Sequence, residues 1–93
     1  MKLENLIKFL EDTIGLPAIV TNCKWVMYHK YNKWCQFKTP TGLQVIHCEL
    51  WSNDGYEWKL HLDSCSNWDL HFMIYGRDNN QNSDLRCNCG CYK

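Results

Sequence analysis

The sequence predicts an α+β fold in which one N-terminal amphipathic helix packs on a five-stranded antiparallel meander sheet. Apolar residues recur with helical spacing in the first fifteen residues, and β-branched and aromatic runs separated by short connectors follow. A chain of 93 residues has room for a single hydrophobic core. Residues 1–93 are therefore predicted to form one domain.

The helix is expected over residues 2–14, where apolar positions follow the i, i+3, i+4, i+7 rule and charged residues take the other face. The apolar set is Leu3, Leu6, Ile7, Leu10 and Ile14. Gly15 suits the C-terminal end of this helix, and Pro17 prevents the helix from continuing.

Five strands are expected after the helix, and short connectors between them favour antiparallel neighbours. Their ranges are 18–28, 32–39, 43–51, 56–63 and 68–75. A three-residue loop with Gly55 in the left-handed conformation would place Leu50 opposite Trp58. Alternate residues of the last strand would face the helix, namely Trp68, Leu70, Phe72 and Ile74.

The same register places His47 opposite His61 on the outer face of the sheet. A second three-residue loop, at residues 65–67, would set His61 opposite His71, so a row of three histidines is predicted. Such a row could hold a catalytic zinc with three protein ligands and a water. The ordinary interpretation, solvated histidines on an open face, is favoured.

Three cysteines at alternate positions near the C-terminus, Cys87, Cys89 and Cys91, predict a structural zinc site. The fourth ligand is expected from Cys65, in the loop before the last strand, with His61 or His71 as alternatives. The metal would clasp the C-terminal tail to the last hairpin. The ligand spacing is not that of a zinc finger, so DNA reading is not inferred.

The chain lacks an N-terminal signal pattern and an apolar run of about 20 residues, so a cytoplasmic protein without a membrane partner is expected. Thiols are kept reduced in that compartment. The seven cysteines are therefore expected to be core residues and metal ligands rather than disulfides. Those inside expected strands, Cys23, Cys35 and Cys48, are predicted to be small buried hydrophobic residues.

Ten basic residues balance ten acidic residues, so no overall field attracts nucleic acid. Nucleophile-elbow, Walker and dinucleotide motifs are missing from the sequence, and a non-enzymatic protein is expected. Aromatic and basic residues alternate in one stretch, which could bind a protein partner or belong to the sheet. The candidates for the partner surface are Trp25, Tyr28, Tyr31, Lys33 and Trp34.

In size and character the whole chain resembles the small single-domain anti-CRISPR proteins of phages and mobile elements that inhibit type II-A Cas9. The shared features are a small helix-plus-sheet domain and no catalytic motif. The resemblance implies a stoichiometric binder, in the cytoplasm of a bacterial host, that blocks target DNA loading or cleavage. The chain is neutral, whereas several such inhibitors are acidic DNA mimics, so DNA mimicry is not expected.

Two other functions stay open. One is a zinc-stabilised nucleic-acid-binding module that uses the basic and aromatic residues 24–38. The other is a small zinc hydrolase or thiol-redox protein that uses the histidines or the cysteine tail.

Overall fold

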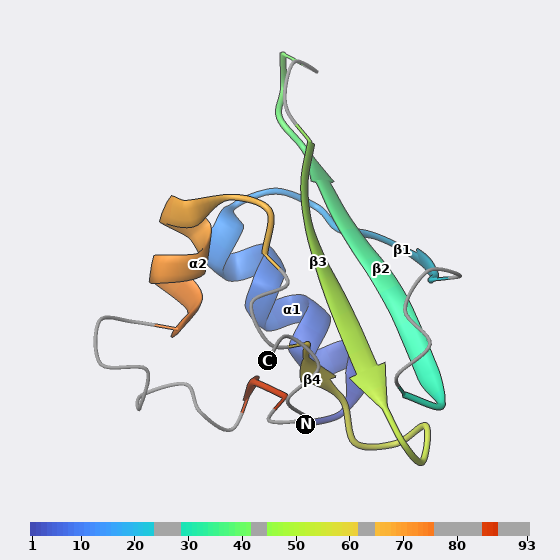
Figure 1. The fold of residues 1–93 in the computed structure, drawn as a ribbon. Coiled ribbons are helices and arrows are strands. Elements are labelled where there is room, and N and C mark those ends of the chain that lie inside the picture. Colours follow the sequence, from blue (N-terminus) through green and yellow to red (C-terminus); the bar gives the residue numbers. More distant parts are fainter. Residues whose placement is uncertain (24–28, 42–44, 62–64, 76–84, 88–93) are drawn as a thin grey trace.

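The computed structural model describes residues 1–23, 29–41, 45–61, 65–75 and 85–87. Its elements are α1 (Leu3–Ile14), β1 (Ile19–Asn22), β2 (Tyr31–Lys38), β3 (Val45–Ser52), β4 (Lys59–Leu60) and α2 (Trp68–Tyr75) (Figure 1). The strands form one antiparallel sheet in the order β1-β2-β3-β4. The α+β class, the N-terminal helix and the antiparallel sheet are thus confirmed, but the sheet of the described residues has four strands rather than five.

Helix α1 begins and ends close to the predicted bounds. Leu6 and Leu10 are fully buried, in agreement with the apolar face of the helix. Gly15 ends the helix in the left-handed conformation, with φ of 79°, and its amide donates to the carbonyl oxygen of Glu11 at 2.7 Å. A side chain at this φ would be strained, so glycine suits this position.

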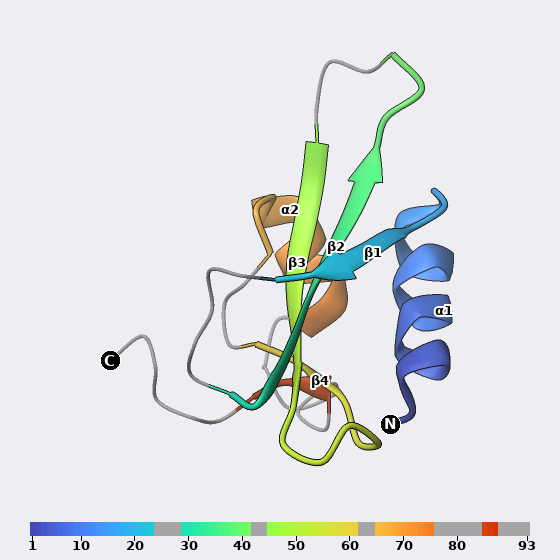
Figure 2. The ribbon, with the colours of Figure 1, turned by 90° about the vertical axis from the view of Figure 1, so that its right-hand side faces the viewer.

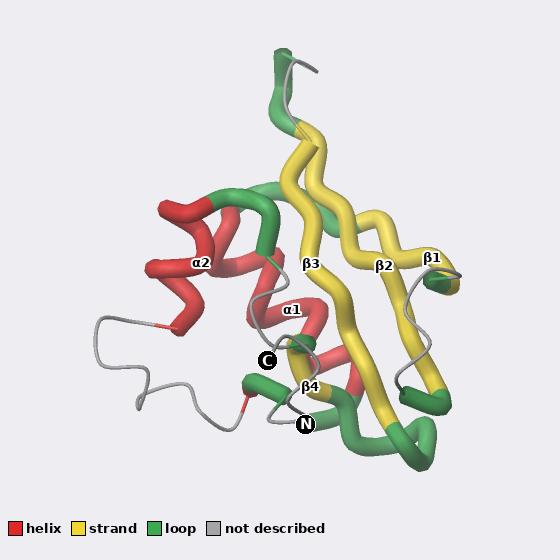
Figure 3. The backbone as a smooth tube through the Cα atoms, viewed as in Figure 1, coloured by secondary structure: helices red, strands yellow, loops and turns green. Residues whose placement is uncertain are grey.

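The core lies between the helices and one face of the sheet. Alternate residues of the two central strands are fully buried, Cys35 and Phe37 in β2 and Cys48 and Leu50 in β3. They pack in one cluster with residues of both helices, namely Leu6, Leu10, Leu70 and Ile74. Both helices therefore cover the same face of the sheet, with α1 beside the strands in Figure 2 and the two helices on one side of β3 in Figure 3.

The prediction of a strand at residues 68–75 is wrong, because this segment is helix α2. Asn67 caps the helix: its Oδ1 accepts the amide of Leu70 at 3.1 Å, and its carbonyl oxygen accepts the amide of His71 at 2.9 Å. Leu70 and Ile74 are one helical turn apart and both buried. Trp68 and Phe72, expected in the core, are exposed instead.

The predicted hairpin after β3 is also different, since β4 contains two residues and pairs Leu50 with Leu60 rather than with Trp58. The cause is the side chain of Asp54, whose Oδ1 accepts the amides of Tyr56 and Glu57 at 2.8 and 2.9 Å. These amides are bonded within the turn, so the connection between the strands is longer. Gly55 does adopt the predicted positive φ, 81°.

The segment 85–87 lies beside β4. Leu60 and Arg86 form an isolated parallel bridge, and the amide of Cys87 donates to the carbonyl oxygen of Leu60 at 2.5 Å. Leu85 is buried in the main core. The start of the cysteine-rich tail is thus fixed against the sheet. Among the described residues, neither helix has the length and apolar character needed to cross a membrane.

Candidate metal centre

Three potential metal ligands from distant parts of the sequence meet at one end of the sheet. His29 precedes β2, His61 directly follows β4, and Cys87 lies in the segment beside β4. Their ligand atoms all lie within 4.8 Å of one another. In the part of the chain that the structure describes, this is the one such group of three or more His, Cys, Asp or Glu side chains.

Backbone hydrogen bonds place two of these residues. The amide of His61 donates to the carbonyl oxygen of Glu49 at 2.8 Å, which continues the pairing of β4 with β3 beyond its last residue. The amide of Cys87 bonds to Leu60, the residue before His61. His61 and Cys87 are therefore held side by side, and each is only 1% exposed.

Aromatic packing places the third residue. The ring of His29 lies on the ring of Trp51, with centroids 3.9 Å apart and planes tilted by 30°. The carbonyl oxygen of His29 accepts the side-chain amide of Asn32 at 2.5 Å. The imidazole is thereby directed at the other two ligands, half-buried, and it also lines a surface cavity of about 440 Å³.

The distance between the ligand atoms of His29 and Cys87 fits a tetrahedral zinc ion. Nε2 of His29 lies 3.4 Å from Sγ of Cys87, and a tetrahedral zinc with usual bond lengths separates a nitrogen and a sulfur ligand by about 3.5 Å. The two histidine rings meet edge to face, with centroids 5.3 Å apart and an angle of 69°. The three side chains can therefore bind one ion after small shifts.

The electrostatics of the cluster also suit a cation. Burial, and after it the neighbouring His61, lowers the pKa of His29 below its ordinary value of 6.5, which favours the neutral imidazole that binds metals. Oε2 of Glu49 lies 3.8 Å from Nδ1 of His61. A carboxylate beside a ligating histidine is a common arrangement, because it orients the ring and strengthens it as a ligand.

Of the predicted zinc ligands, Cys87 and the alternative ligand His61 belong to this cluster, whereas Cys89 and Cys91 lie outside the described residues. Cys65 lies elsewhere, with its Sγ 2.9 Å from Sγ of Cys48. His71, the other alternative, stacks on Trp68 in α2.

His29 was not among the predicted ligands. It comes just before a strand, where a side chain is free to turn, and the same argument selected Cys65. Its place before a strand is the only feature of the sequence that indicates His29 as a ligand. No local spacing pattern links it to His61 and Cys87, because they lie 32 and 58 residues further along the chain.

The predicted row of three histidines does not exist. His71 lies on a helix, His61 is buried, and His47 is stacked on Trp34 of the neighbouring strand with centroids 4.2 Å apart. The row required the strand at residues 68–75 and the register that the turn at Asp54 changes.

The predicted partner surface is described in part, because Trp25 and Tyr28 lie outside the described residues. Tyr31 is exposed, Lys33 donates from Nζ to Oδ1 of Asn22 at 3.0 Å, and Trp34 is half-buried.

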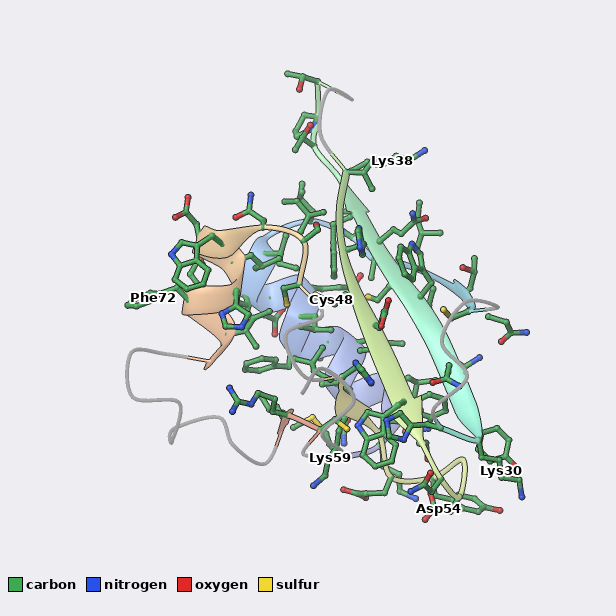
Figure 4. The ribbon with its side chains drawn as sticks, in the orientation of Figure 1. Lys30, Lys38, Cys48, Asp54, Lys59 and Phe72 are labelled. Carbon is green, nitrogen blue, oxygen red and sulfur yellow. The ribbon has the colours of Figure 1, made fainter. Side chains whose placement is uncertain are left out.

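Exposed apolar side chains also lie on α2, where Trp68, Phe72 and Met73 are 75%, 43% and 58% exposed. Phe72 projects from the outer side of this helix (Figure 4). The sequence did not reveal this surface, since the strand pattern assigned Trp68 and Phe72 to the core.

Comparisons with known proteins add no relative: no family model matches the chain, and no similar curated protein or solved structure was found.

Proposed function

We propose that this protein is a non-enzymatic binding protein whose fold is stabilised by a structural zinc ion. The main support for a zinc ion is the cluster of His29, His61 and Cys87, whose ligand atoms all lie within 4.8 Å of one another. One ion at this point would join the start of β2, the end of β4 and the C-terminal segment.

The ligand types support zinc over other metals. Two imidazoles and a thiolate match the nitrogen and sulfur ligands that zinc prefers, whereas calcium and magnesium prefer oxygen. A thiolate in a buried position is also stabilised by a cation.

Burial supports a structural role. His61 and Cys87 are almost completely buried, and structural zinc sites are closed by four protein ligands. We propose that Cys89 or Cys91 supplies the fourth ligand, since they follow Cys87 by two and four residues. The ion would then fix the tail of a small domain, for which such support is common.

Metal analysis tests this proposal. The purified protein should contain about one zinc per chain, and a chelator should lower its melting temperature. His29→Ala should remove the zinc, whereas His47→Ala, which removes an imidazole of β3 outside the cluster, should keep it. A metal-free wild-type protein that melts at the same temperature with and without chelator contradicts the proposal.

Cobalt substitution separates the structural site from a catalytic one. Co²⁺ in a closed site should give a tetrahedral spectrum that added azide or imidazole does not change. A spectrum that shifts with azide would indicate an open coordination position, and would favour the alternative of a small zinc hydrolase.

For the partner we propose Cas9, on the resemblance in size and character to anti-CRISPR proteins. The absence of net charge favours a protein over a nucleic acid as the partner. The exposed rings and thioether of Trp68, Phe72 and Met73 supply the kind of surface that anchors protein interfaces.

A cleavage assay tests the partner. Type II-A Cas9 with its guide RNA, incubated with increasing amounts of the protein, should lose target cleavage with an end point near one inhibitor per Cas9. Unchanged cleavage at a large excess of the protein contradicts Cas9 as the partner. Salt-sensitive binding to single-stranded DNA in the same preparation would favour the nucleic-acid-binding alternative.

A further inference from the structure

A second pair of sulfur atoms lies apart from the metal cluster. Sγ of Cys48, in β3, and Sγ of Cys65, in the segment before α2, are 2.9 Å apart, and both residues are free thiols. Cys48 lies on the side of β3 that faces the helices (Figure 4). A disulfide bond is about 2.0 Å long, so the two sulfur atoms need to approach by only about 0.9 Å.

Two hydrogen bonds hold the neighbours of this pair together. The amide of Ser66 donates to the carbonyl oxygen of His47 at 3.0 Å, and the amide of His47 donates to the hydroxyl oxygen of Ser66 at 3.0 Å. Since His47 precedes Cys48 and Ser66 follows Cys65, these bonds fix the two backbones beside the sulfur atoms. The contact between the thiols is thus part of the fold.

The two thiols differ in access. Cys48 is fully buried, whereas Cys65 is half-buried and lines a surface cavity of about 470 Å³ together with Ser66, Trp68 and His71. A small oxidant can enter this cavity and reach Cys65, but it cannot reach Cys48 from solvent.

We propose that Cys48 and Cys65 are a reversible redox site, which a hydroperoxide converts to a disulfide. The thiolate of Cys65 attacks one peroxide oxygen, breaks the O–O bond and becomes a sulfenic acid, while the other oxygen leaves as hydroxide and becomes water with the proton that the Cys65 thiol released. The sulfur of Cys48 then attacks the sulfenic sulfur, the S–O bond breaks, and the displaced hydroxyl group leaves with the proton of Cys48 as a second water. Both thiols are oxidised, the peroxide is reduced to two waters, and a dithiol reductant reverses the reaction.

The order of these steps agrees with the surroundings of Cys48. Its hydrogen bond to Cys65, and then burial, raise the pKa of Cys48, which disfavours its thiolate, so the accessible Cys65 reacts with the peroxide first. The disulfide would join β3 covalently to the residue that leads into α2. Oxidation would thereby fix the position of the helix that exposes Trp68.

Peptide mapping of the zinc-containing protein tests the proposal, because trypsin separates the two cysteines. Residues 39–59 contain only Cys48, and residues 60–77 contain only Cys65. After treatment with about one equivalent of hydrogen peroxide, the two peptides should appear linked, with two hydrogen atoms fewer than their sum. The link should disappear with dithiothreitol.

Zinc content and a second buried cysteine provide the controls. Cys35, which faces Cys48 across β2 and β3, lies alone in the peptide of residues 34–38. Cys35→Ala should leave the link intact. Cys65→Ala should lose the link and keep its zinc, so the redox site and the metal site can fail independently.

Three results would overturn the proposal: oxidation of Cys65 to sulfinic acid while Cys48 stays a thiol, a link between Cys48 and Cys35, or loss of zinc from Cys65→Ala. Loss of zinc from Cys65→Ala would indicate that Cys65 is a zinc ligand. If Cys65→Ala does not fold, the peptide map of the wild-type protein still decides between a link and no link.

Discussion

Nε2 of His29 lies 3.4 Å from Sγ of Cys87, although 58 positions separate these residues in the sequence. A contact of this kind between a half-buried imidazole and a buried thiol connects the start of β2 to the C-terminal segment. The two residues meet because the amide of Cys87 bonds to Leu60 and the ring of His29 packs on Trp51. The sheet therefore arranges the ligands, and an ion would hold both segments there.

Replacement of Cys87 tests the contribution of this contact. Cys87→Ser should abolish stoichiometric zinc binding and lower the melting temperature, because a hydroxyl is a poor replacement for a zinc-bound thiolate. Cys23→Ser, at a half-buried cysteine outside the cluster, should keep one zinc. Metal analysis and thermal melts of the two variants give the answer, and equal zinc content in both would exclude Cys87 as a ligand.

Glu49 provides a subtler test, since it would act through His61 and not on the ion. Its Oε2 lies 3.8 Å from Nδ1 of His61. Glu49→Gln should weaken zinc binding by roughly 10–100-fold, the usual effect of removing a carboxylate partner of a ligating histidine. A competition titration with a chromophoric chelator measures this affinity. Glu4→Gln, at an exposed position of α1, makes the same change in charge and should bind zinc like the wild-type protein.

The lowered pKa of His29 predicts how the metal-free protein responds to acid. The folded state disfavours the imidazolium, so the unfolded chain binds more protons as the pH falls below 6.5, the ordinary pKa of histidine. The contribution of His29 to stability is therefore present above pH 6.5 and is lost as the pH falls toward its lowered folded pKa.

Urea unfolding of the chelator-treated protein at a series of pH values measures this effect. His29→Ala should show a smaller loss of stability on acidification than the wild-type protein, whereas His47→Ala should retain the wild-type loss. Parallel curves for the wild-type protein and His29→Ala would show that this histidine does not contribute. With zinc present, acid should also release the metal, because protons compete for the same ligands.

Much of the architecture could be predicted from the sequence. The spacing of apolar residues in α1 and the glycine at its end, Gly15, were sufficient to predict that helix. The alternation of apolar and polar residues located β2 and β3 to within one or two residues. The second helix was missed because Leu70 and Ile74 share one face in a strand as well as in a helix. The distinguishing signal was Asn67, a preferred residue before the first turn of a helix.

The metal site could be predicted only in part. The alternating cysteines predicted Cys87 as a zinc ligand, but tertiary structure decides which histidines lie beside it. His61 was expected on the outer face of a longer strand, and the carboxylate of Asp54 shortens that strand by capturing two amides. Local patterns therefore indicated the ligand types, whereas the positions of the ligands depended on turns and packing.

The capping role of Asn67 can be measured directly. Asn67→Ala should destabilise the protein by about 1 kcal/mol, because the amide of Leu70 loses its side-chain acceptor. Urea unfolding checks this value. Asn53→Ala, at an exposed loop position after β3, should change stability by less than about 0.5 kcal/mol. An equally small effect at Asn67 would argue against the cap and against a helix that begins at Trp68.

The proposed partner surface makes the last prediction. Trp68 is 75% exposed and lies on the same helix as the exposed Phe72 and Met73, so its removal should hardly affect folding. Trp68→Ala should weaken inhibition of Cas9 cleavage by at least about 10-fold, as expected for a central aromatic anchor of an interface. Tyr56→Ala, at a 69% exposed ring in the turn after β3, is the matched control and should inhibit like the wild-type protein. If Trp34→Ala weakens inhibition and Trp68→Ala does not, the partner binds the sheet and not α2.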